Sequence, residues 1–248
     1  MLALLATPSL AQEGRSLRIA TEGAYPPFNV VDATGEVQGF EIDLARAFCA
    51  AIKARCTFVI QQWDGITRGL LDREVDAIVA SLHVTERRRR QIAFSRPYYR
   101  IPSTVIARKD SSLTGVTAEA LAGLSIGTVE RSEVTSYLEA RYATSDVKLY
   151  GKLEEASLDL LTERLDVVAG DKLVLSRFLA SREGACCRII GDLPADPAYF
   201  NPGAAIGLRQ DETALRAAFD AAIAQVIKDG TYDRIREKYF AFDVKPPG

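Results

Sequence analysis

This sequence of 248 residues has no long hydrophobic run, no excess of charge of one sign and only one histidine. No apolar stretch reaches the roughly 18 residues that a membrane-spanning helix needs. The single histidine, His83, and the lack of a histidine cluster argue against the common zinc sites. The formal net charge is −2, with no acidic or basic tail, so charge gives no reason to expect a nucleic acid or a membrane surface as a partner.

What is present suits a globular, exported protein. Hydrophobic residues make up 48% of the chain, which is enough for a sizeable core, and the length allows one large or two modest domains. The apolar start and the small-residue pattern Ser9-Leu10-Ala11 predict that residues 1–11 are the remnant of a signal peptide. We therefore leave these residues out of the predicted fold.

The four cysteines are interpreted in the light of that export. Cys49 and Cys56 are seven positions apart, and a disulfide between them would suit an oxidising compartment. Cys186 and Cys187 are adjacent, so a strained vicinal disulfide, two thiols and partners elsewhere all remain open.

Short apolar runs alternate with amphipathic segments, which predicts an α/β fold. Residues 39–52 are one such segment, because Phe40, Leu44, Phe48 and Ile52 recur every four residues. The predicted strands cover 17–20, 56–60, 75–80, 124–129, 147–150, 167–170 and 188–190, and the predicted helices cover 39–52, 66–71, 133–142, 153–164, 172–180, 212–228 and 231–240.

Two extended stretches, near residues 100–107 and 200–207, predict that the chain leaves one lobe and later returns to it. We place lobe 1 at residues 12–100 plus 203–248, and lobe 2 at residues 101–202. Each lobe is expected to be a mainly parallel sheet flanked by helices. The two connecting strands form a hinge that can bend over a cleft between the lobes.

An arginine-rich run, residues 81–90, directly follows the apolar strand predicted at 75–80. In open α/β sheets, ligands bind beyond the carboxyl ends of the strands, and arginine holds carboxylates with two parallel hydrogen bonds. A solvated face or a nucleic-acid patch is the alternative for such a run. We assign Arg87, Arg89 and Arg90 to solvent, and composition alone leaves the site open.

A set of short motifs runs along the chain: Glu22-Gly-Ala-Tyr25-Pro-Pro-Phe28, Gly39-Phe-Glu-Ile-Asp43-Leu44, Trp63-Asp-Gly65, Val75-Asp-Ala-Ile78, Thr85-Glu-Arg-Arg88, Phe94-Ser-Arg-Pro-Tyr98-Tyr99 and Asp229-Gly-Thr-Tyr232. In these motifs the chain resembles the extracellular solute-binding proteins of polar amino-acid ABC transporters, above all the binders of histidine, lysine/arginine/ornithine, arginine and opines. The resemblance extends from Ile19 to Phe242 and implies a two-lobe, Venus-flytrap fold. It also implies the Cys49–Cys56 disulfide.

Position by position, the resemblance implies that Arg88 grips the α-carboxylate of a ligand and that Asp171 in lobe 2 takes its α-ammonium. Ser81 matches a hydroxyl contact. A structural ion pair is the alternative role for Arg88, and a helix N-cap is the alternative for Asp171. Opposite charges clamped from two lobes would couple binding to closure.

For the ligand side chain, the resemblance implies that Tyr25 and Trp63 are flanking rings and that Glu22 meets a cationic end. Aromatic faces can hold a guanidinium or an ammonium group. The alternatives are core aromatics for Tyr25 and Trp63 and a solvated loop acid for Glu22.

The sequence departs from the family pattern at the carboxylate end of the site. Glu130-Arg131-Ser132-Glu133 stands where a Gly-Thr-Thr-like turn is usual, and His83 stands where serine is common. Ser132 keeps one hydroxyl, whereas Glu133 replaces a ligand-facing threonine, unless it only caps its helix. The added bulk and charge would suit an opine or another derivative with an additional polar group.

The resemblance implies an extracytoplasmic, non-enzymatic protein, secreted through the inner membrane into the periplasm. It would capture a polar, cationic amino acid or an opine-like derivative in the interlobe cleft and deliver it to a membrane ABC permease. We expect a monomer with no cofactor and no metal. The alternative is a periplasmic cyclohexadienyl or arogenate dehydratase of the same fold, with Glu133 or Asp171 near His83 as a general acid.

Overall fold

The computed structural model describes residues 15–246, so the predicted signal-peptide remnant, residues 1–11, lies outside the described residues. Contacts divide the chain into two compact units. Unit 1 runs to Tyr98 and resumes at Ala204–Asp243, whereas unit 2 comprises Tyr99–Gly203 and the residues from Val244 onward. The C-terminal end therefore groups with unit 2, where the Arg100 N–H donates to the Val244 carbonyl at 2.8 Å.

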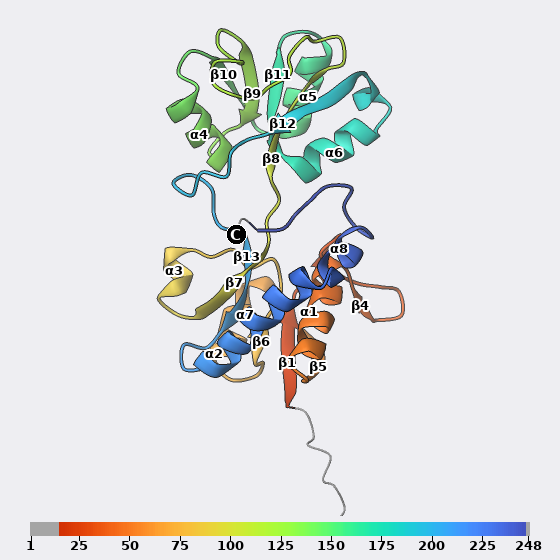
Figure 1. Cartoon of the computed structure of the whole chain (residues 1–248), viewed down its shortest axis with the longest axis vertical. Helices are drawn as coiled ribbons and strands as arrows, with labels where there is room; N and C mark the ends of the chain where they lie inside the picture. Colours follow the sequence, from red (N-terminus) through yellow and green to blue (C-terminus); the bar gives the residue numbers. More distant parts are fainter. Residues whose placement is uncertain (1–14, 247–248) are drawn as a thin grey trace, which may run out of the picture. The chain divides into compact units, whose positions relative to one another are not determined.

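Unit 1 is built on a five-stranded sheet in the order β5-β1-β6-β13-β7 (Figure 1). Strand β1 runs parallel to β5 and β6, whereas β13 runs antiparallel to β6. The strands are β1 (Ser16–Thr21), β5 (Arg55–Ile60), β6 (Ala77–Ile78), β7 (Ala93–Tyr99) and β13 (Ala204–Leu208), and a small second sheet contains β2 (Ala24–Tyr25), β3 (Asn29–Val31) and β4 (Val37–Gln38).

Helices cover this sheet because their apolar positions share one face. In α1 (Phe40–Ala51), Phe40, Leu44 and Phe48 are fully buried, and the helix contacts α7 (Thr213–Lys228) and α8 (Thr231–Arg236). Figure 1 shows these three helices lying together. The remaining helical segments of unit 1 are η1 (Trp63–Gly65), α2 (Ile66–Leu71) and α3 (Glu86–Arg89).

Unit 2 has a second five-stranded sheet, in the order β10-β9-β11-β8-β12. Its strands are β8 (Ser103–Arg108), β9 (Ser125–Val129), β10 (Asp146–Tyr150), β11 (Val167–Asp171) and β12 (Cys187–Asp192). Its helical segments are α4 (Glu133–Arg141), α5 (Leu153–Leu161), α6 (Lys172–Ala180) and η2 (Glu183–Cys186).

The two faces of this second sheet bury alternate residues, as a strand with helices on both sides requires. Val105 and Ala107 pack in the core beneath α4, whereas Ile106 between them packs with residues of α5 and α6. The same alternation in β11 sends Val167 to one core and Val168 to the other.

The predicted α/β class is confirmed, but both sheets are mixed. The β1-β5-β6 and β9-β10-β11 parts are parallel, whereas β8 is antiparallel to both β11 and β12. The crossing strands enter their sheets from the opposite end, which reverses their direction. The last helix ends at Arg236 rather than at residue 240, and only Ala77 and Ile78 of the strand predicted at 75–80 are assigned to it.

The predicted disulfide between Cys49 and Cys56 is present and joins α1 to β5. Cys186 and Cys187 are free thiols. Within residues 15–246, no helix combines the length and the apolar character needed to cross a membrane.

Candidate functional site

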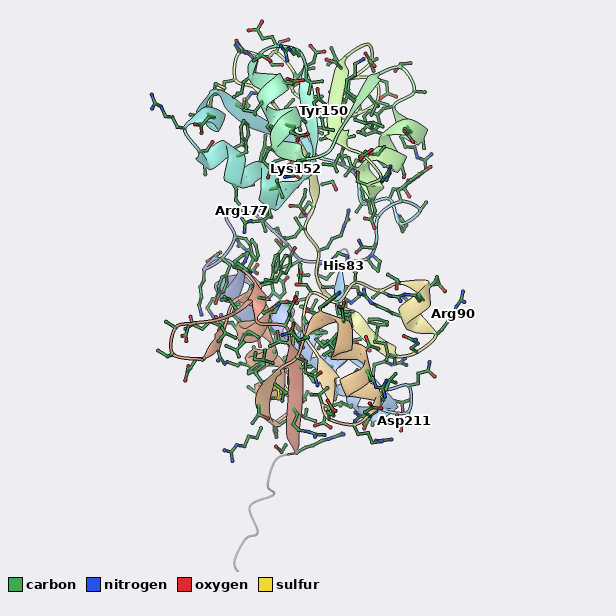
Figure 2. The ribbon with its side chains drawn as sticks, turned by 180° about the vertical axis from the view of Figure 1, so that it is seen from behind. His83, Arg90, Tyr150, Lys152, Arg177 and Asp211 are labelled. Atoms are coloured by element: carbon green, nitrogen blue, oxygen red, sulfur yellow. A yellow bond between two sulfur atoms is a disulfide. The ribbon has the colours of Figure 1, made fainter. Side chains whose placement is uncertain are left out.

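The expected contacts of unit 1 gather at one edge of its sheet. Glu22 directly follows β1, Trp63 lies three residues after β5, and Ser81 and His83 follow β6. Parallel strands place their carboxyl ends together, and this is the edge where ligands bind in α/β sheets. In Figure 2, His83 lies at this end of unit 1, and Asp211 lies at the other.

Arg88 presents its guanidinium at this edge. Its backbone N–H donates to the Oγ1 atom of Thr85, the α3 N-cap, at 3.3 Å. Its side chain donates from Nη1 to the His83 carbonyl at 2.9 Å, and its Cζ atom lies 5.2 Å from the centroid of the Trp63 ring. Among the described residues, no carboxylate forms an ion pair with Arg88, so the structural-pair alternative finds no acid there.

The environment of Arg88 is poor in compensating charge. Burial, followed by repulsion from Arg87, lowers the pKa of Arg88 from its ordinary value. A guanidinium stays charged at neutral pH even so. A bound carboxylate would offset both effects.

Tyr25 and Trp63 are not core aromatics. Their exposed fractions are 49% and 37%, which makes them two of the largest exposed apolar side chains in the described chain. Tyr25 stacks on the buried Phe28 ring at 4.9 Å between centroids, which holds its own ring in place. Glu22 is half-buried.

Ser81 is tied to a buried acid that the sequence did not reveal as functional. Ser81 adopts the left-handed backbone conformation, with φ of 52°, and donates to the Glu41 carboxylate from its backbone N at 2.7 Å and from Oγ at 2.8 Å. Because its hydroxyl proton already goes to Glu41, Ser81 can meet a ligand only as a hydrogen-bond acceptor.

Glu41 is fully buried and accepts two further hydrogen bonds, from Asn29 Nδ2 at 2.8 Å and from the Tyr98 hydroxyl. Asn29 in turn accepts from the backbone N of Gly23, the residue after Glu22, at 2.8 Å. Burial raises the pKa of Glu41, and these hydrogen bonds counter it. One carboxylate thus fixes the loops that carry Glu22 and Ser81.

Sequence reasoning could have found Glu41 by one signal. It lies between Phe40 and Ile42 at the start of an apolar helix, and all three residues are buried. An acid inside such a run needs hydrogen-bond donors around it.

In unit 2, the predicted contacts also lie at carboxyl ends of strands. Asp171 ends β11 and caps α6, where its Oδ1 accepts from the Val174 N–H at 3.0 Å, and its side chain is exposed. Ser132 caps α4, where its Oγ accepts from the Thr135 N–H at 3.1 Å and donates to the Val129 carbonyl at 2.9 Å. Both side chains therefore act as helix N-caps.

Glu133 does not cap its helix, since Ser132 holds that place. Its carboxylate instead accepts from Asn201 Nδ2 at 2.9 Å. Burial lowers the pKa of Arg100, and the charge of Glu133 counters this effect. The preceding Arg131 has φ of 56°, a conformation that costs a residue with a Cβ atom on the order of 1 kcal/mol. Glycine would fit this position without that cost.

A cavity of about 560 Å³ opens beside Trp63 and Arg88, within unit 1. Ile66, Leu82 and Arg87 are among the residues that line it, and Arg87 is exposed. Small-molecule sites commonly have volumes of roughly 300–1,000 Å³. The described residues include no group of three or more histidine, cysteine or acidic side chains placed to hold a metal.

The family model for bacterial extracellular solute-binding proteins, family 3, matches residues 17–242. The chain belongs to this family. It is 33% identical to the L-arginine-binding protein of Pseudomonas aeruginosa, over 98% of this chain and 94% of that protein. It is 34% identical to the lysine/arginine/ornithine-binding periplasmic protein of Escherichia coli, over 96% of this chain and 93% of that protein.

A solved structure supports the fold. The L-cystine solute receptor of Neisseria gonorrhoeae, in its unliganded open conformation, matches with a TM-score of 0.80 and 22% identity, over 95% of this chain and 97% of that one. The two relatives are named for binding amino acids and not for an enzymatic activity, which supports the expectation that this family member is not an enzyme.

Proposed function

We propose that this solute-binding protein captures an amino acid with a cationic side chain, or a derivative of one, and delivers it to a membrane ABC permease. The observation that carries the proposal is the Arg88 guanidinium, stacked on the exposed Trp63 ring at the ligand-binding edge of the sheet and without a carboxylate ion pair among residues 15–246. Full-length relatives named for arginine and for lysine, arginine and ornithine support the ligand class.

In this proposal Arg88 holds the α-carboxylate, and Asp171 and Ser81 receive the α-ammonium. The exposed Asp171 carboxylate accepts a hydrogen bond at the helix cap, and a carboxylate can accept several donors at once. Ser81 suits the ammonium because its hydroxyl donates its proton to Glu41, so its oxygen would meet the ligand as a hydrogen-bond acceptor.

The cationic end of the ligand would lie between the Tyr25 and Trp63 rings and face Glu22. Both rings are exposed, and cation–π contacts contribute about 0.5–2 kcal/mol. Glu22 is half-buried and lies three residues before Tyr25 in sequence, so its charge would be only partly screened.

His83, Ser132 and Glu133 are the proposed source of selectivity beyond a plain basic amino acid. The Glu133 carboxylate already binds Asn201, which places a fixed negative charge where the family often has a neutral hydroxyl. A ligand with an additional donor group would make use of that charge.

Partner and location follow from the same family relationship. We propose that the chain acts as a monomer in the periplasm and that its partner is an ABC permease complex in the inner membrane. The names of both relatives describe binding proteins, and one of them is periplasmic.

The proposal is tested by removing any co-purified ligand through unfolding and refolding, and then measuring thermal shifts with arginine, lysine, ornithine, histidine and an opine. At least one of these should raise the melting temperature, because a ligand at 100 times its Kd stabilises by about 2.7 kcal/mol. No shift with any of them would refute the proposal. Prephenate belongs in the same panel, and its conversion to product would establish the dehydratase alternative instead.

A further inference from the structure

Two adjacent thiols meet at the junction of η2 and β12, in unit 2. The Sγ atoms of Cys186 and Cys187 are 3.4 Å apart. Consecutive side chains in a strand point to opposite faces, so neighbours in sequence do not ordinarily meet in this way. Here Cys186 ends the helical turn and Cys187 begins the strand, and the change of backbone conformation turns both side chains toward one another.

The two thiols differ in access. Cys186 is exposed, whereas Cys187 is 4% exposed and packs in the core with Ile106, Leu153 and Leu175. Burial, with the contact to Cys186, raises the pKa of Cys187 to about 12. A reagent in solution therefore meets the Cys186 sulfur first.

A positive side chain lies near the exposed thiol. Arg108 interacts electrostatically with Cys186. The two acids beside it are engaged with Arg108, Asp110 at 2.8 Å and Glu163 at 3.1 Å.

The surroundings favour redox chemistry over metal binding. Structural metal sites use three or four ligands, and the described part of the chain holds no third histidine, cysteine or acid placed to complete such a set. Two thiols in contact, one exposed and one buried, are instead the arrangement of an attacking and a resolving cysteine.

We propose that Cys186 and Cys187 form a reversible two-electron redox site that closes to a vicinal disulfide by exchange with a low-molecular-weight disulfide. The Cys186 thiolate attacks one sulfur of that disulfide, which forms a mixed disulfide on Cys186 and releases one thiolate, later protonated by solvent. Cys187 then loses its proton and attacks the Cys186 sulfur, and the second thiol leaves. The protein loses two hydrogens and two electrons, and the oxidant becomes two thiols.

The closed form should be easy to reduce. Adjacent Cα atoms are about 3.8 Å apart, which is below the usual range of about 4.4–6.8 Å for disulfides, and strained disulfides are more reducible. The Cys49–Cys56 pair has its Cα atoms 6.2 Å apart and lies within that range. The chain thus carries its own reference disulfide.

The redox site is remote from the proposed ligand contacts of unit 2. Along β8, Ser103 pairs with Asp171, and Arg108 pairs with Cys187. Five residues of strand separate these pairs, which corresponds to about 17 Å. Oxidation should therefore leave ligand affinity unchanged, and the inference stands or falls independently of the proposed function.

The test uses the full chain in buffers of graded reduced-to-oxidised glutathione ratio, followed by alkylation and peptide mass spectrometry. The expected result is a Cys186–Cys187 peptide that loses two hydrogens in oxidising buffer and regains them at a ratio where Cys49–Cys56 remains oxidised. Two alkylated thiols at every ratio would overturn the proposal, as would a glutathione adduct that persists on Cys186 without closure.

Two single variants separate the steps. Cys187→Ser should accumulate the glutathione adduct on Cys186, because no resolving thiol remains. Cys186→Ser should stay unmodified at Cys187, because that sulfur is buried. If Cys186→Ser becomes modified as fast as the wild type, the assigned roles are wrong.

Discussion

Glu41→Gln is the substitution that most sharply probes the buried network beneath the site. The Oε1 atom of Glu41 accepts from the Ser81 backbone N and the Tyr98 hydroxyl, and Oε2 accepts from Asn29 Nδ2 and Ser81 Oγ. The side-chain oxygen of a glutamine can still accept from the Ser81 backbone N and the Tyr98 hydroxyl. The Ser81 hydroxyl can rotate to accept a hydrogen bond from the glutamine NH₂ group. The Asn29 amide cannot turn its oxygen toward the glutamine NH₂ group, because Asn29 Oδ1 already accepts a hydrogen bond from the Gly23 N–H.

One buried amide donor is therefore left facing another, which costs about 1–3 kcal/mol. Urea unfolding followed by the fluorescence of Trp63, the single tryptophan, should show a loss of that size at neutral pH. Glu36→Gln is the matched control, because Glu36 is an exposed acid of the same unit. Asn29→Asp added to Glu41→Gln reverses the donor and acceptor and should recover part of the loss.

The contribution of Glu41 to the free energy of unfolding should depend on pH in a definite direction. Burial raises the pKa of Glu41, so the folded state holds this proton more tightly than the unfolded chain does. Its contribution to stability is then greatest below the unfolded pKa of about 4.3 and is lost as the pH rises through the raised folded pKa. Glu41→Gln does not titrate, so the stability gap between wild type and variant should narrow as the pH rises across that window. Equal stability of wild type and variant at every pH would refute the role of Glu41.

Three further outcomes are expected. The double variant Cys49→Ala with Cys56→Ala should lower the free energy of unfolding by about 2.4 kcal/mol, which is the loop-closure value for this sequence separation. Urea unfolding measures this change, and an unchanged midpoint would contradict the prediction. Asp171→Asn should keep the melting temperature within a degree or two, because asparagine caps helices as well as aspartate does. Ligand affinity, measured by calorimetry, should fall at least tenfold. An unchanged affinity would assign Asp171 to capping alone. Arg131→Gly should leave the protein as stable or make it slightly more stable, because glycine accepts the left-handed conformation without strain, and a clear loss of melting temperature would contradict that.

The sequence predicted the parts of the fold that depend on local periodicity. The four-residue spacing of Phe40, Leu44 and Phe48 placed α1 within one residue of each end. The site edge was predictable because the carboxyl ends of parallel strands meet, and this brings Trp63 and Ser81 to the same end of unit 1. The antiparallel strands were not predictable, since strand direction depends on where a crossing segment enters the sheet.

Tertiary contacts explain what else escaped prediction. The apolar neighbours of Glu41 in sequence indicate that it is buried, but only the fold brings Ser81, Asn29 and Tyr98 around it. The contact between Cys186 and Cys187 depends on the backbone conformation at one junction, which sequence patterns do not specify.

Calorimetric titration of the ligand-stripped protein and of Arg88→Ala, with Arg89→Ala as control, tests the central claim most directly. Removing one partner of a desolvated charge pair costs about 2–5 kcal/mol, so Arg88→Ala should weaken binding roughly 30-fold to several-thousand-fold. Arg89→Ala should bind as the wild type does, because Arg89 is an exposed residue of the same helix that does not line the cavity. Wild-type affinity in Arg88→Ala, or an equal loss in Arg89→Ala, would contradict the assignment of Arg88 as the residue that holds the ligand carboxylate.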